Sequence, residues 1–358
     1  MRTTYNFNPG PAVLPEDVLE QAREELLDYR GSGMSLLESS HRGKEYSAVH
    51  EEAIANIREL LGLSDDYAVL FLQGGASLQF AMVPMNLLGA NQTADYVVSG
   101  SWAAKALKEA KLLGNVNVAA DCAREMPTRV PSADELALTN GAAYVHLTSN
   151  ETIAGAQWKS FPDTAAPLVA DMSSDILSRP FDAGRFALIY AGAQKNLGPA
   201  GVTLVVIRKD LADRTPERVP TLLRYGTHIE RNSLFNTPPC FGIYLVLLVT
   251  RWVKKTGLAE LHDRNRSKAA RIYRVIDRTG FYRGTAVPAC RSDMNVTFRL
   301  PSEDLEAAFT AEAAAQGLKG LKGHRSVGGI RASIYNAFPV EGVEALVSFM
   351  EDFEQRNG

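Results

Sequence analysis

The sequence has no long apolar run and almost no net charge, and each absence removes a class of protein. The longest apolar stretch, Phe241–Val249, is too short to span a bilayer, which needs about 20 apolar residues. The first residues, Met1–Asn6, lack the apolar core of a signal peptide, so we expect a cytoplasmic protein. With 38 basic and 41 acidic residues, no basic face for nucleic acid or anionic lipid stands out. We therefore expect partners that are small molecules or further copies of the chain, and neither nucleic acid nor a membrane.

Cysteine is also scarce. Cys122, Cys240 and Cys290 are far apart, and no CxxC pair or histidine cluster accompanies them. We expect reduced thiols in a cytoplasmic protein, with no disulfide framework and no metal site. The sequence also lacks the P-loop and GxGxxG patterns, so a phosphate group would have to bind at some other turn.

What is present is an ordinary globular composition, with 46% hydrophobic and 22% charged residues over 358 positions. Short apolar segments rich in β-branched residues alternate with helical patterns, which predicts an α/β fold with a mostly parallel sheet covered on both faces. Ligands of such sheets bind at the carboxyl ends of the strands. The predicted strands are Tyr67–Leu72, Ala94–Ser99, Val116–Ala119, Ala142–Thr148, Pro167–Asp171, Phe186–Tyr190 and Val202–Ile207.

The sequence outside this alternation predicts a division into a large and a small domain. Prolines and a glycine keep Asn6–Val13 extended, and helical patterns follow from Pro15 and over Val49–Leu61. Later segments predict two long helices and a smaller α+β unit: Leu245–Val253, Leu261–Thr279, Met294–Leu300, Ser302–Gln316, Val327–Tyr335 and Val340–Phe353. We predict an N-terminal segment, residues 1–15, that packs with the small domain, a large domain at 16–257 and a small C-terminal domain at 258–358.

One lysine stands in an unusual place. Lys195 lies within Ala191–Gly201, a stretch of small residues between two predicted buried strands. At a strand end it would be partly desolvated, and there an amine can lose its proton near neutral pH and attack a carbonyl group. The ordinary alternative is a solvated loop lysine.

Other chemically active residues follow other strands. Gln73–Ser77 leads into a helix, where free N–H groups bind anions, although a plain tight turn has the same pattern. Trp102 could stack on a planar ligand or belong to the core. Ser149–Thr152 gathers hydroxyl and amide groups at a strand end. Asp171 follows a buried apolar strand, where a carboxylate needs a cation or a hydrogen-bond donor.

Together these residues match the needs of pyridoxal 5′-phosphate. Its phosphate needs an anion site, its ring a stacking partner, its pyridinium nitrogen a carboxylate and its aldehyde an amine. Asp171 precedes Lys195 by 24 positions, about one strand–loop–strand unit, which favours an active Lys195 over a surface lysine.

Three further sites point to an anionic substrate. The dipeptide His-Arg occurs twice, at His41-Arg42 and at His324-Arg325, and Arg331 follows soon after. Guanidinium groups bind carboxylates and phosphates in a bidentate manner, and histidine adds a donor whose charge follows pH. Two coincidental surface pairs are the alternative.

The sequence resembles the phosphoserine aminotransferases of the class-V pyridoxal-phosphate family from about Asn6 to the C-terminus. The matching motifs are Asn6–Ala12, Ser39–Tyr46, Gln73–Phe80, Gly100–Trp102, Asn150–Thr152, Ala170–Ser174, Ala191–Asn196 and Asn236–Pro239. The resemblance implies a fold-type I homodimer with its active site at the subunit interface. It also implies reversible transamination of 3-phosphohydroxypyruvate with L-glutamate to O-phospho-L-serine and 2-oxoglutarate, in L-serine biosynthesis and, in some bacteria, vitamin B6 biosynthesis.

The resemblance assigns roles to individual residues. Lys195 would form the internal aldimine in a ping-pong reaction, and Asp171 would pair with the pyridine nitrogen. The other implied cofactor contacts are Ala76, Ser77 and Gln194 at the phosphate, Trp102 on the ring, Thr152, and Asn236 and Thr237 at the phosphate of the neighbouring subunit. The implied substrate contacts are Arg331 at the α-carboxylate, and His41 and Arg42 with the partner chain's His324 and Arg325 at the distal anion.

One departure and two alternatives remain. Some family members carry a glycine-arginine pair where this chain has Ala76-Ser77, so a positive charge at the distal pocket is missing. Another class-V enzyme, an alanine-glyoxylate type transaminase or a cysteine desulfurase, is one alternative, although no cysteine here has the context of a mobile nucleophile. The other is a non-catalytic protein of the same fold.

Overall fold

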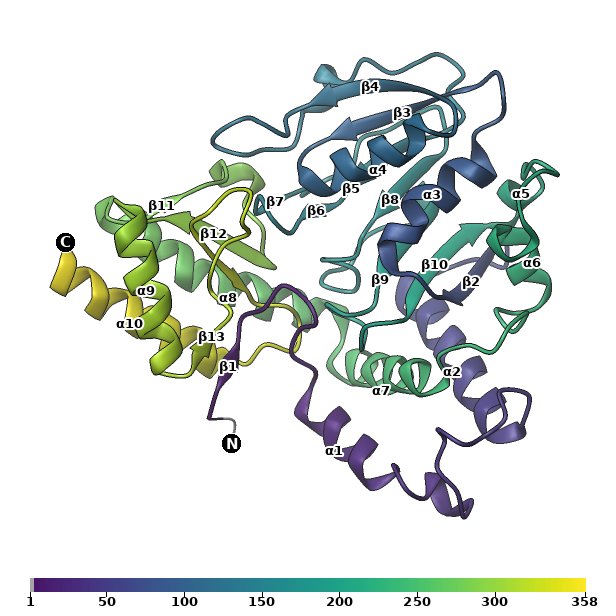
Figure 1. Cartoon of the computed structure of the whole chain (residues 1–358), viewed down its shortest axis with the longest axis horizontal. Coiled ribbons are helices and arrows are strands. Elements are labelled where there is room, and N and C mark those ends of the chain that lie inside the picture. The colour runs from purple at the N-terminus through teal and green to yellow at the C-terminus, as the bar shows by residue number, and fades with distance from the viewer. Residues whose placement is uncertain (1–2) are drawn as a thin grey trace.

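The computed structural model describes residues 3–358 and has an α/β architecture (Figure 1). Its helices are α1 Glu16–Glu24, α2 Lys44–Leu61, α3 Gly75–Leu87, α4 Ser101–Lys111, α5 Lys209–Ala212, α6 Tyr225–Glu230, α7 Cys240–Thr256, α8 Leu258–Thr279, α9 Glu303–Ala315 and α10 Val340–Asn357. Its strands are β1 Tyr5–Asn6, β2 Tyr67–Leu72, β3 Thr93–Val98, β4 Asn115–Asp121, β5 Val145–Thr148, β6 Asn150–Glu151, β7 Ala156–Gln157, β8 Leu168–Asp171, β9 Phe186–Gly192, β10 Thr203–Arg208, β11 Arg283–Gly284, β12 Asn295–Arg299, β13 Leu318–Lys319 and β14 Ile330–Ser333.

The central sheet has seven strands in the order β2-β10-β9-β8-β5-β3-β4. Strand β10 runs antiparallel to both β2 and β9, and the remaining neighbours are parallel. These strands correspond to the seven that the sequence predicts. The prediction of a mostly parallel α/β sheet is therefore confirmed.

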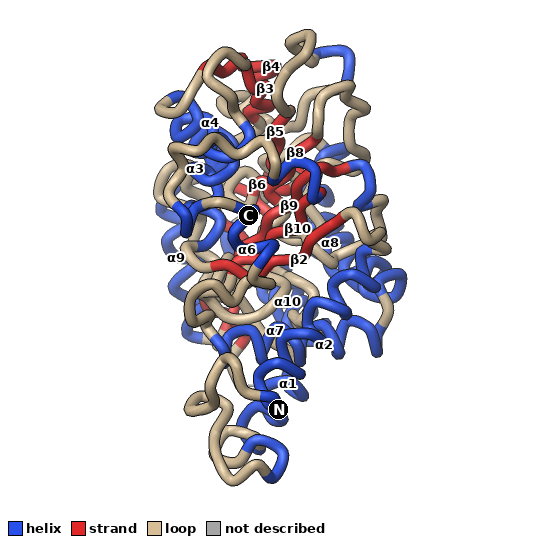
Figure 2. Tube along the Cα trace, turned by 90° about the vertical axis from the view of Figure 1, so that its right-hand side faces the viewer, coloured by secondary structure: helices blue, strands red, loops and turns tan. Residues whose placement is uncertain are grey.

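Helices cover both faces of this sheet, as the continuously apolar strands require. Along β2 the side chains alternate between two buried clusters. Val69 and Phe71 belong to the cluster that includes α2 and α7, whereas Leu70 and Leu72 belong to the cluster that includes α3 and α4. Figure 2, turned by 90°, shows α3 and α4 to one side of the strands.

The C-terminal part of the chain has its own sheet and core. Strands β11, β12 and β14 form an antiparallel sheet, and α8, α9 and α10 pack with it around a third apolar cluster. Strand β1 joins this region: Tyr5 pairs with Leu318 of β13, and Phe7 is fully buried in the third cluster. The boundaries at residues 15 and 257 stay predictions.

Several predicted elements have other limits, and α2, for example, begins at Lys44 and not at the predicted Val49. The strand predicted at Val327–Tyr335 is only β14, because Gly328 and Gly329 have φ angles of 68° and 71° and form a turn. Helix α7 begins earlier than predicted, at Cys240 directly after Pro239, because a proline lacks the N–H that a helix start leaves unpaired. The strand predicted from Ala142 begins at Val145. Within residues 3–358 no helix is long and apolar enough to cross a membrane.

Candidate active site

A cavity of about 360 Å³ lies at the carboxyl ends of β5, β8 and β9, next to the first turns of α3 and α4. This is the edge of the sheet at which α/β proteins bind ligands. Seven of the residues predicted for the site line it: Ala76, Ser77, Trp102, Thr152, Asp171, Gln194 and Lys195. These side chains are spread over 120 positions of the sequence. They meet here because each lies at the carboxyl end of a strand or in the first turn of a helix at this edge of the sheet.

The amine of Lys195 faces the cavity. Its Nζ donates a hydrogen bond to Oγ1 of Thr152 at 2.7 Å and lies 5.8 Å from the centroid of the Trp102 ring. Burial lowers the pKa of Lys195 to about 8, although the charges of Asp171 and Glu151 raise it. An amine with this pKa has a substantial neutral fraction near pH 7, which a nucleophile needs.

The carboxylate of Asp171 is buried at the end of β8. Its Oδ1 accepts hydrogen bonds from the main-chain N–H of Ser173 at 2.9 Å and from the Ser173 hydroxyl at 2.5 Å. The hydroxyl itself accepts a hydrogen bond from Gly192 at 3.0 Å, which fixes its direction. Burial raises the pKa of Asp171, while the Ser173 contacts and the charge of Lys195 lower it. Both hydrogen bonds fall on Oδ1, so Oδ2 is left for a cationic ligand.

The first turn of α3 supplies an anion site. Gly74 and Gly75 have φ angles of 86° and 65°, and this left-handed turn brings the chain from β2 directly into the helix. No side chain caps the helix, so the N–H groups of its first turn, including those of Ala76 and Ser77, are free to bind a ligand. A Cβ on Gly75 would meet no atom within 4 Å, so there is open space beside the turn.

Arg331 enters the site from the C-terminal sheet. Its guanidinium group is buried and donates a hydrogen bond to the main-chain oxygen of Thr152 at 3.4 Å. Its Nε has no partner among residues 3–358, and burial lowers its pKa. A buried guanidinium with an unpaired donor is costly unless an anion binds to it.

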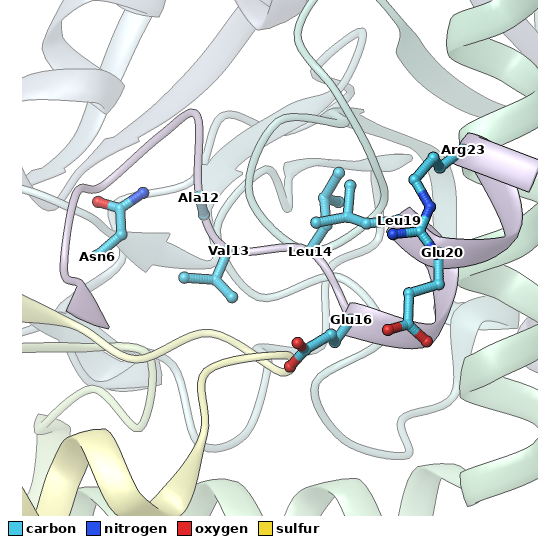
Figure 3. Close-up of a pocket in the computed structure, with 8 residues that line it drawn as sticks. All are labelled: Asn6, Ala12, Val13, Leu14, Glu16, Leu19, Glu20 and Arg23. Atoms are coloured by element: carbon cyan, nitrogen blue, oxygen red, sulfur yellow. The ribbon is translucent and has the colours of Figure 1, made fainter. Parts of the chain in front are cut away.

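The N-terminal segment covers the loop that carries Lys195. The main-chain N–H of Ala12 donates to the oxygen of Gln194 at 2.9 Å, and a Cβ on Gly10 would lie 3.4 Å from Cγ of Lys195. The same segment and α1 border a separate hollow of about 470 Å³ (Figure 3). That hollow is lined by residues between Asn6 and Arg23 and contains none of the predicted site residues.

Seven predicted residues do not line the cavity: Arg331, which lies beside it and contacts Thr152, and six others. Asn236 and Thr237 lie beside Gln73, with the Asn236 amide donating to Gln73 at 3.2 Å. The other four are His41 and Arg42, in the loop before α2, and His324 and Arg325, in the loop before β14. Burial lowers the pKa of His324, and the charges of Arg331, Lys105 and Arg325 lower it further, so this loop is within electrostatic reach of the site.

Sequence reasoning missed several contributors. Ser173 orients Asp171, and its only signal was its place two residues later, where a hydroxyl can reach back to the preceding carboxylate. Lys105 places its Nζ 3.9 Å from the Trp102 ring centroid, and its signal was its helical spacing of three from Trp102. The carboxylate of Glu151 accepts two main-chain hydrogen bonds from α4, and nothing in the sequence marked this contact.

The expected cofactor fits these residues. The uncapped turn of α3 suits a phosphate, Oδ2 of Asp171 suits a protonated ring nitrogen, and the amine of Lys195 suits an aldehyde. Trp102 lines the cavity, where its indole can stack on the cofactor ring.

Comparison with known proteins gives consistent results. The sequence model of the class-V aminotransferases matches residues 4–346. The phosphoserine aminotransferase of Herpetosiphon aurantiacus is 57% identical over 359 residues, which cover 99% of this chain and 100% of that protein. Among solved structures, the phosphoserine aminotransferase from Bacillus circulans subsp. alkalophilus is 56% identical with a TM-score of 0.96 and covers 99% of both chains. A pyridoxal-phosphate-bound phosphoserine aminotransferase from Trichomonas vaginalis is 40% identical with a TM-score of 0.93, and covers 97% of this chain and 99% of that one.

Proposed function

Since the chain belongs to the class-V aminotransferase family, we propose that it transfers the amino group of L-glutamate to 3-phosphohydroxypyruvate, giving 2-oxoglutarate and O-phospho-L-serine. The protein is a pyridoxal-phosphate-dependent aminotransferase. One observation carries the proposal: an amine of lowered pKa, a buried carboxylate and an uncapped helix turn meet in one cavity.

The residues that would hold the cofactor follow from this geometry. We propose that the N–H groups of Ala76 and Ser77, with Gln194, bind its phosphate, and that Trp102 packs against its ring. Thr152, which already accepts a hydrogen bond from Lys195, would contact the ring edge. When bound, pyridoxal phosphate carries the amino group between the two substrates and withdraws electrons from the substrate α-carbon.

Two side chains would perform the proton chemistry. The carboxylate of Asp171, held by Ser173, would keep a proton on the ring nitrogen. Nζ of Lys195 would take the proton from the substrate α-carbon, because its pKa of about 8 lets it act as a base and as an acid near neutral pH. The hydroxyl of Thr152 would orient the amine for this transfer.

Substrate recognition rests on arginine. We propose that Arg331 binds the α-carboxylate of both substrates, because its guanidinium is buried beside the cavity with a free donor. His41, Arg42, His324 and Arg325 would bind the distal group, which is a carboxylate in glutamate and a phosphate in the phosphorylated substrate. With Ala76-Ser77 in the helix turn, no arginine of that turn shares this task.

The positions of Asn236 and Thr237 favour a homodimer with shared active sites. Neither residue lines the cavity of its own chain, and both lie at an exposed turn beside Gln73. We propose that they reach the cofactor phosphate of the neighbouring subunit. Mixing a Lys195→Ala chain with an Arg325→Ala chain tests this: a confirmed heterodimer should regain part of the activity, and a heterodimer without any recovery would contradict shared sites.

Domain organisation and location complete the proposal. We propose an N-terminal segment at residues 1–15, a large cofactor domain at 16–257 and a small domain at 258–358. All three cysteines are free thiols, which suits a reducing compartment, and we propose a cytoplasmic location.

A substrate comparison tests the function against its alternatives. The wild-type protein should convert phosphoserine with 2-oxoglutarate at least 100-fold faster, in kcat/KM, than alanine with glyoxylate, because a distal anion adds about 3 kcal/mol of binding in a site built for it. The Lys195→Ala variant is the control for background turnover. Equal rates with the two substrate pairs would favour an alanine-glyoxylate type enzyme, and release of sulfide from cysteine would indicate a desulfurase.

A further inference from the structure

Helix α4 carries Trp102 in its first turn but has no capping side chain of its own. The helix begins at Ser101, and the residue before it, Gly100, has no side chain that could accept a hydrogen bond. Main-chain N–H groups in the first turn of a helix have no acceptor inside the helix. An acceptor must therefore come from another part of the chain.

Glu151 provides that acceptor from β6, 49 positions after Trp102. Its Oε2 accepts a hydrogen bond from the main-chain N–H of Trp102 at 3.2 Å, and its Oε1 accepts one from Ala103 at 3.1 Å. The hydroxyl of Ser99 donates a longer bond to Oε1 at 3.4 Å. A carboxylate at this end of a helix is also stabilised by the helix dipole.

The carboxylate lies so close to α4 that residue 100 has to be glycine. A Cβ on Gly100 would lie 2.5 Å from Cδ of Glu151 and 2.6 Å from its Oε2. The Glu151 side chain is completely buried, and burial raises its pKa to about 7 although the two main-chain donors lower it. A buried acid costs more than an apolar side chain of the same shape, so its presence requires a specific contact. The contact that the structure provides is with the start of α4.

The indole of Trp102 packs against the apolar cluster that includes α3 and α4, and its ring contact with Lys105, whose Nζ lies 3.9 Å from the ring centroid, is made within α4 itself. Its Nε1 forms no hydrogen bond within the part of the chain that the structure describes. Its nearest ring neighbour, Phe80, is tilted, with centroids 6.4 Å apart. The position of the indole therefore depends on the main chain at residue 102, which Glu151 holds.

We infer that Glu151 is a positioning residue for the cofactor site: by capping α4 it fixes the indole of Trp102 relative to Thr152 and Lys195. The inference rests on the proposed function, in which Trp102 packs against the cofactor ring. Thr152 directly follows Glu151 and accepts the hydrogen bond from Lys195. The two consecutive residues Glu151 and Thr152 thus position both the indole that packs against the cofactor ring and the hydroxyl that bonds to the reactive amine.

Two variants break this contact in different ways. Glu151→Gln keeps the side-chain shape but leaves one acceptor oxygen for two amides, and Gly100→Ala keeps the carboxylate but places a methyl group where it lies. The control is Ser302→Ala, which removes the hydroxyl that accepts a hydrogen bond from Leu305 at 3.2 Å at the start of α9. All three proteins lose a helix cap, but only the first two lose the cap of α4.

Two measurements report on the inference. In the cofactor-free proteins, hydrogen exchange at the amides of Trp102 and Ala103 should be roughly three- to thirtyfold faster in both α4 variants and unchanged in Ser302→Ala. With pyridoxal phosphate added, quenching of Trp102 fluorescence should weaken and the dissociation constant should rise by a similar factor. A background of Trp158→Phe and Trp252→Phe leaves Trp102 as the sole tryptophan, since the chain has three.

The outcomes separate the two claims. If the amides of Trp102 and Ala103 exchanged at the wild-type rate in both α4 variants, the inference would be wrong. It would also be wrong if exchange were faster but fluorescence quenching and cofactor affinity matched those of Ser302→Ala, because Glu151 would then have only a structural role. A wild-type protein that takes up no pyridoxal phosphate would refute the proposed function itself. Uptake by the wild type with no change in the variants refutes only the role of Glu151.

Discussion

The amine of Lys195 should capture pyridoxal phosphate with a pH dependence centred near 8, and two charged neighbours should move that centre in opposite directions. Burial lowers the pKa of Lys195 from 10.5 to about 8, the charge of Asp171 raises it and the charge of Arg331 lowers it. At pH 7 about one amine in ten is then neutral, against about three in 10,000 for an ordinary lysine, a difference of about 300-fold in reactive amine.

Cofactor-free wild type, Asp171→Asn and Arg331→Gln would be mixed with pyridoxal phosphate, and the visible absorbance would be followed from pH 7 to pH 10. The second phosphate pKa is about 6, so the phosphate group of the cofactor is mainly a dianion over this range. For the wild type the rate should rise about tenfold per pH unit below 8 and level off above it. Asp171→Asn should level off at a lower pH, because a negative neighbour is lost, and Arg331→Gln at a higher pH, because a positive neighbour is lost.

The control for this experiment is Lys195→Ala, which should leave the absorbance spectrum of the added cofactor unchanged. Lys268 is a second buried lysine with a pKa lowered to about 7, but its Nζ donates to the main-chain oxygens of Ile334 and Tyr335 at 3.0 and 2.6 Å. It should not react, and a change in the cofactor spectrum with Lys195→Ala would show that it does. If the rate levelled off at the same pH in wild type, Asp171→Asn and Arg331→Gln, neighbouring charges would not set the reactivity of the amine. If it levelled off near pH 10.5, burial would not set it either.

Three other substitutions have distinct expected effects. Ser173→Ala removes the hydroxyl that donates to Asp171 at 2.5 Å, and we expect about a tenfold lower kcat with little change in KM, measured by steady-state kinetics; a changed KM alone would contradict this. Arg331→Lys should raise KM for both amino-acid substrates about 100-fold while cofactor affinity in a titration stays the same, because a lysine loses the bidentate contact. Lys268→Met leaves several main-chain oxygens of residues 334–338 without their donor, so the free energy of unfolding in urea should fall by about 2–4 kcal/mol; an unchanged value would show that water replaces the ammonium group.

The fold was predictable because the sequence repeats one physical pattern. Each strand of the central sheet is apolar on both faces, as β2 shows with Val69 and Leu70 in different clusters, and this pattern occurs when helices cover both sides. The meeting of Asp171 and Lys195 was predictable for the same reason. Their strands, β8 and β9, are parallel neighbours, so the residues that follow them reach the same edge.

The rest of the site depends on contacts that no local pattern encodes. The bond between Glu151 and α4 joins residues 49 positions apart and needs a glycine at 100 for steric reasons alone. The turn at Gly328 and Gly329 shortened β14, although the apolar residues around it favoured a longer strand. Arg42 and Arg325, which we propose as contacts of the distal anion, lie outside the cavity of the single chain, so this proposal depends on a partner subunit that the sequence of one chain cannot position.

The electrostatics of the cavity explain why it selects a ligand of one charge pattern. Burial raises the pKa of Asp171 and Glu151 and lowers that of Lys195 and Arg331, because it makes the charged form of each group more costly. A ligand with a cation at Asp171 and an anion at Arg331 reverses two of these penalties at once, and a second anion meets the free N–H groups at the start of α3. Pyridoxal phosphate with an amino-acid substrate has this distribution of charge, whereas a neutral ligand of the same size would leave the buried charges uncompensated. Burying the charges of Asp171 and Arg331 is costly in the free protein. Binding of a ligand with charges opposite to theirs removes this cost, so the site favours such ligands over neutral ones.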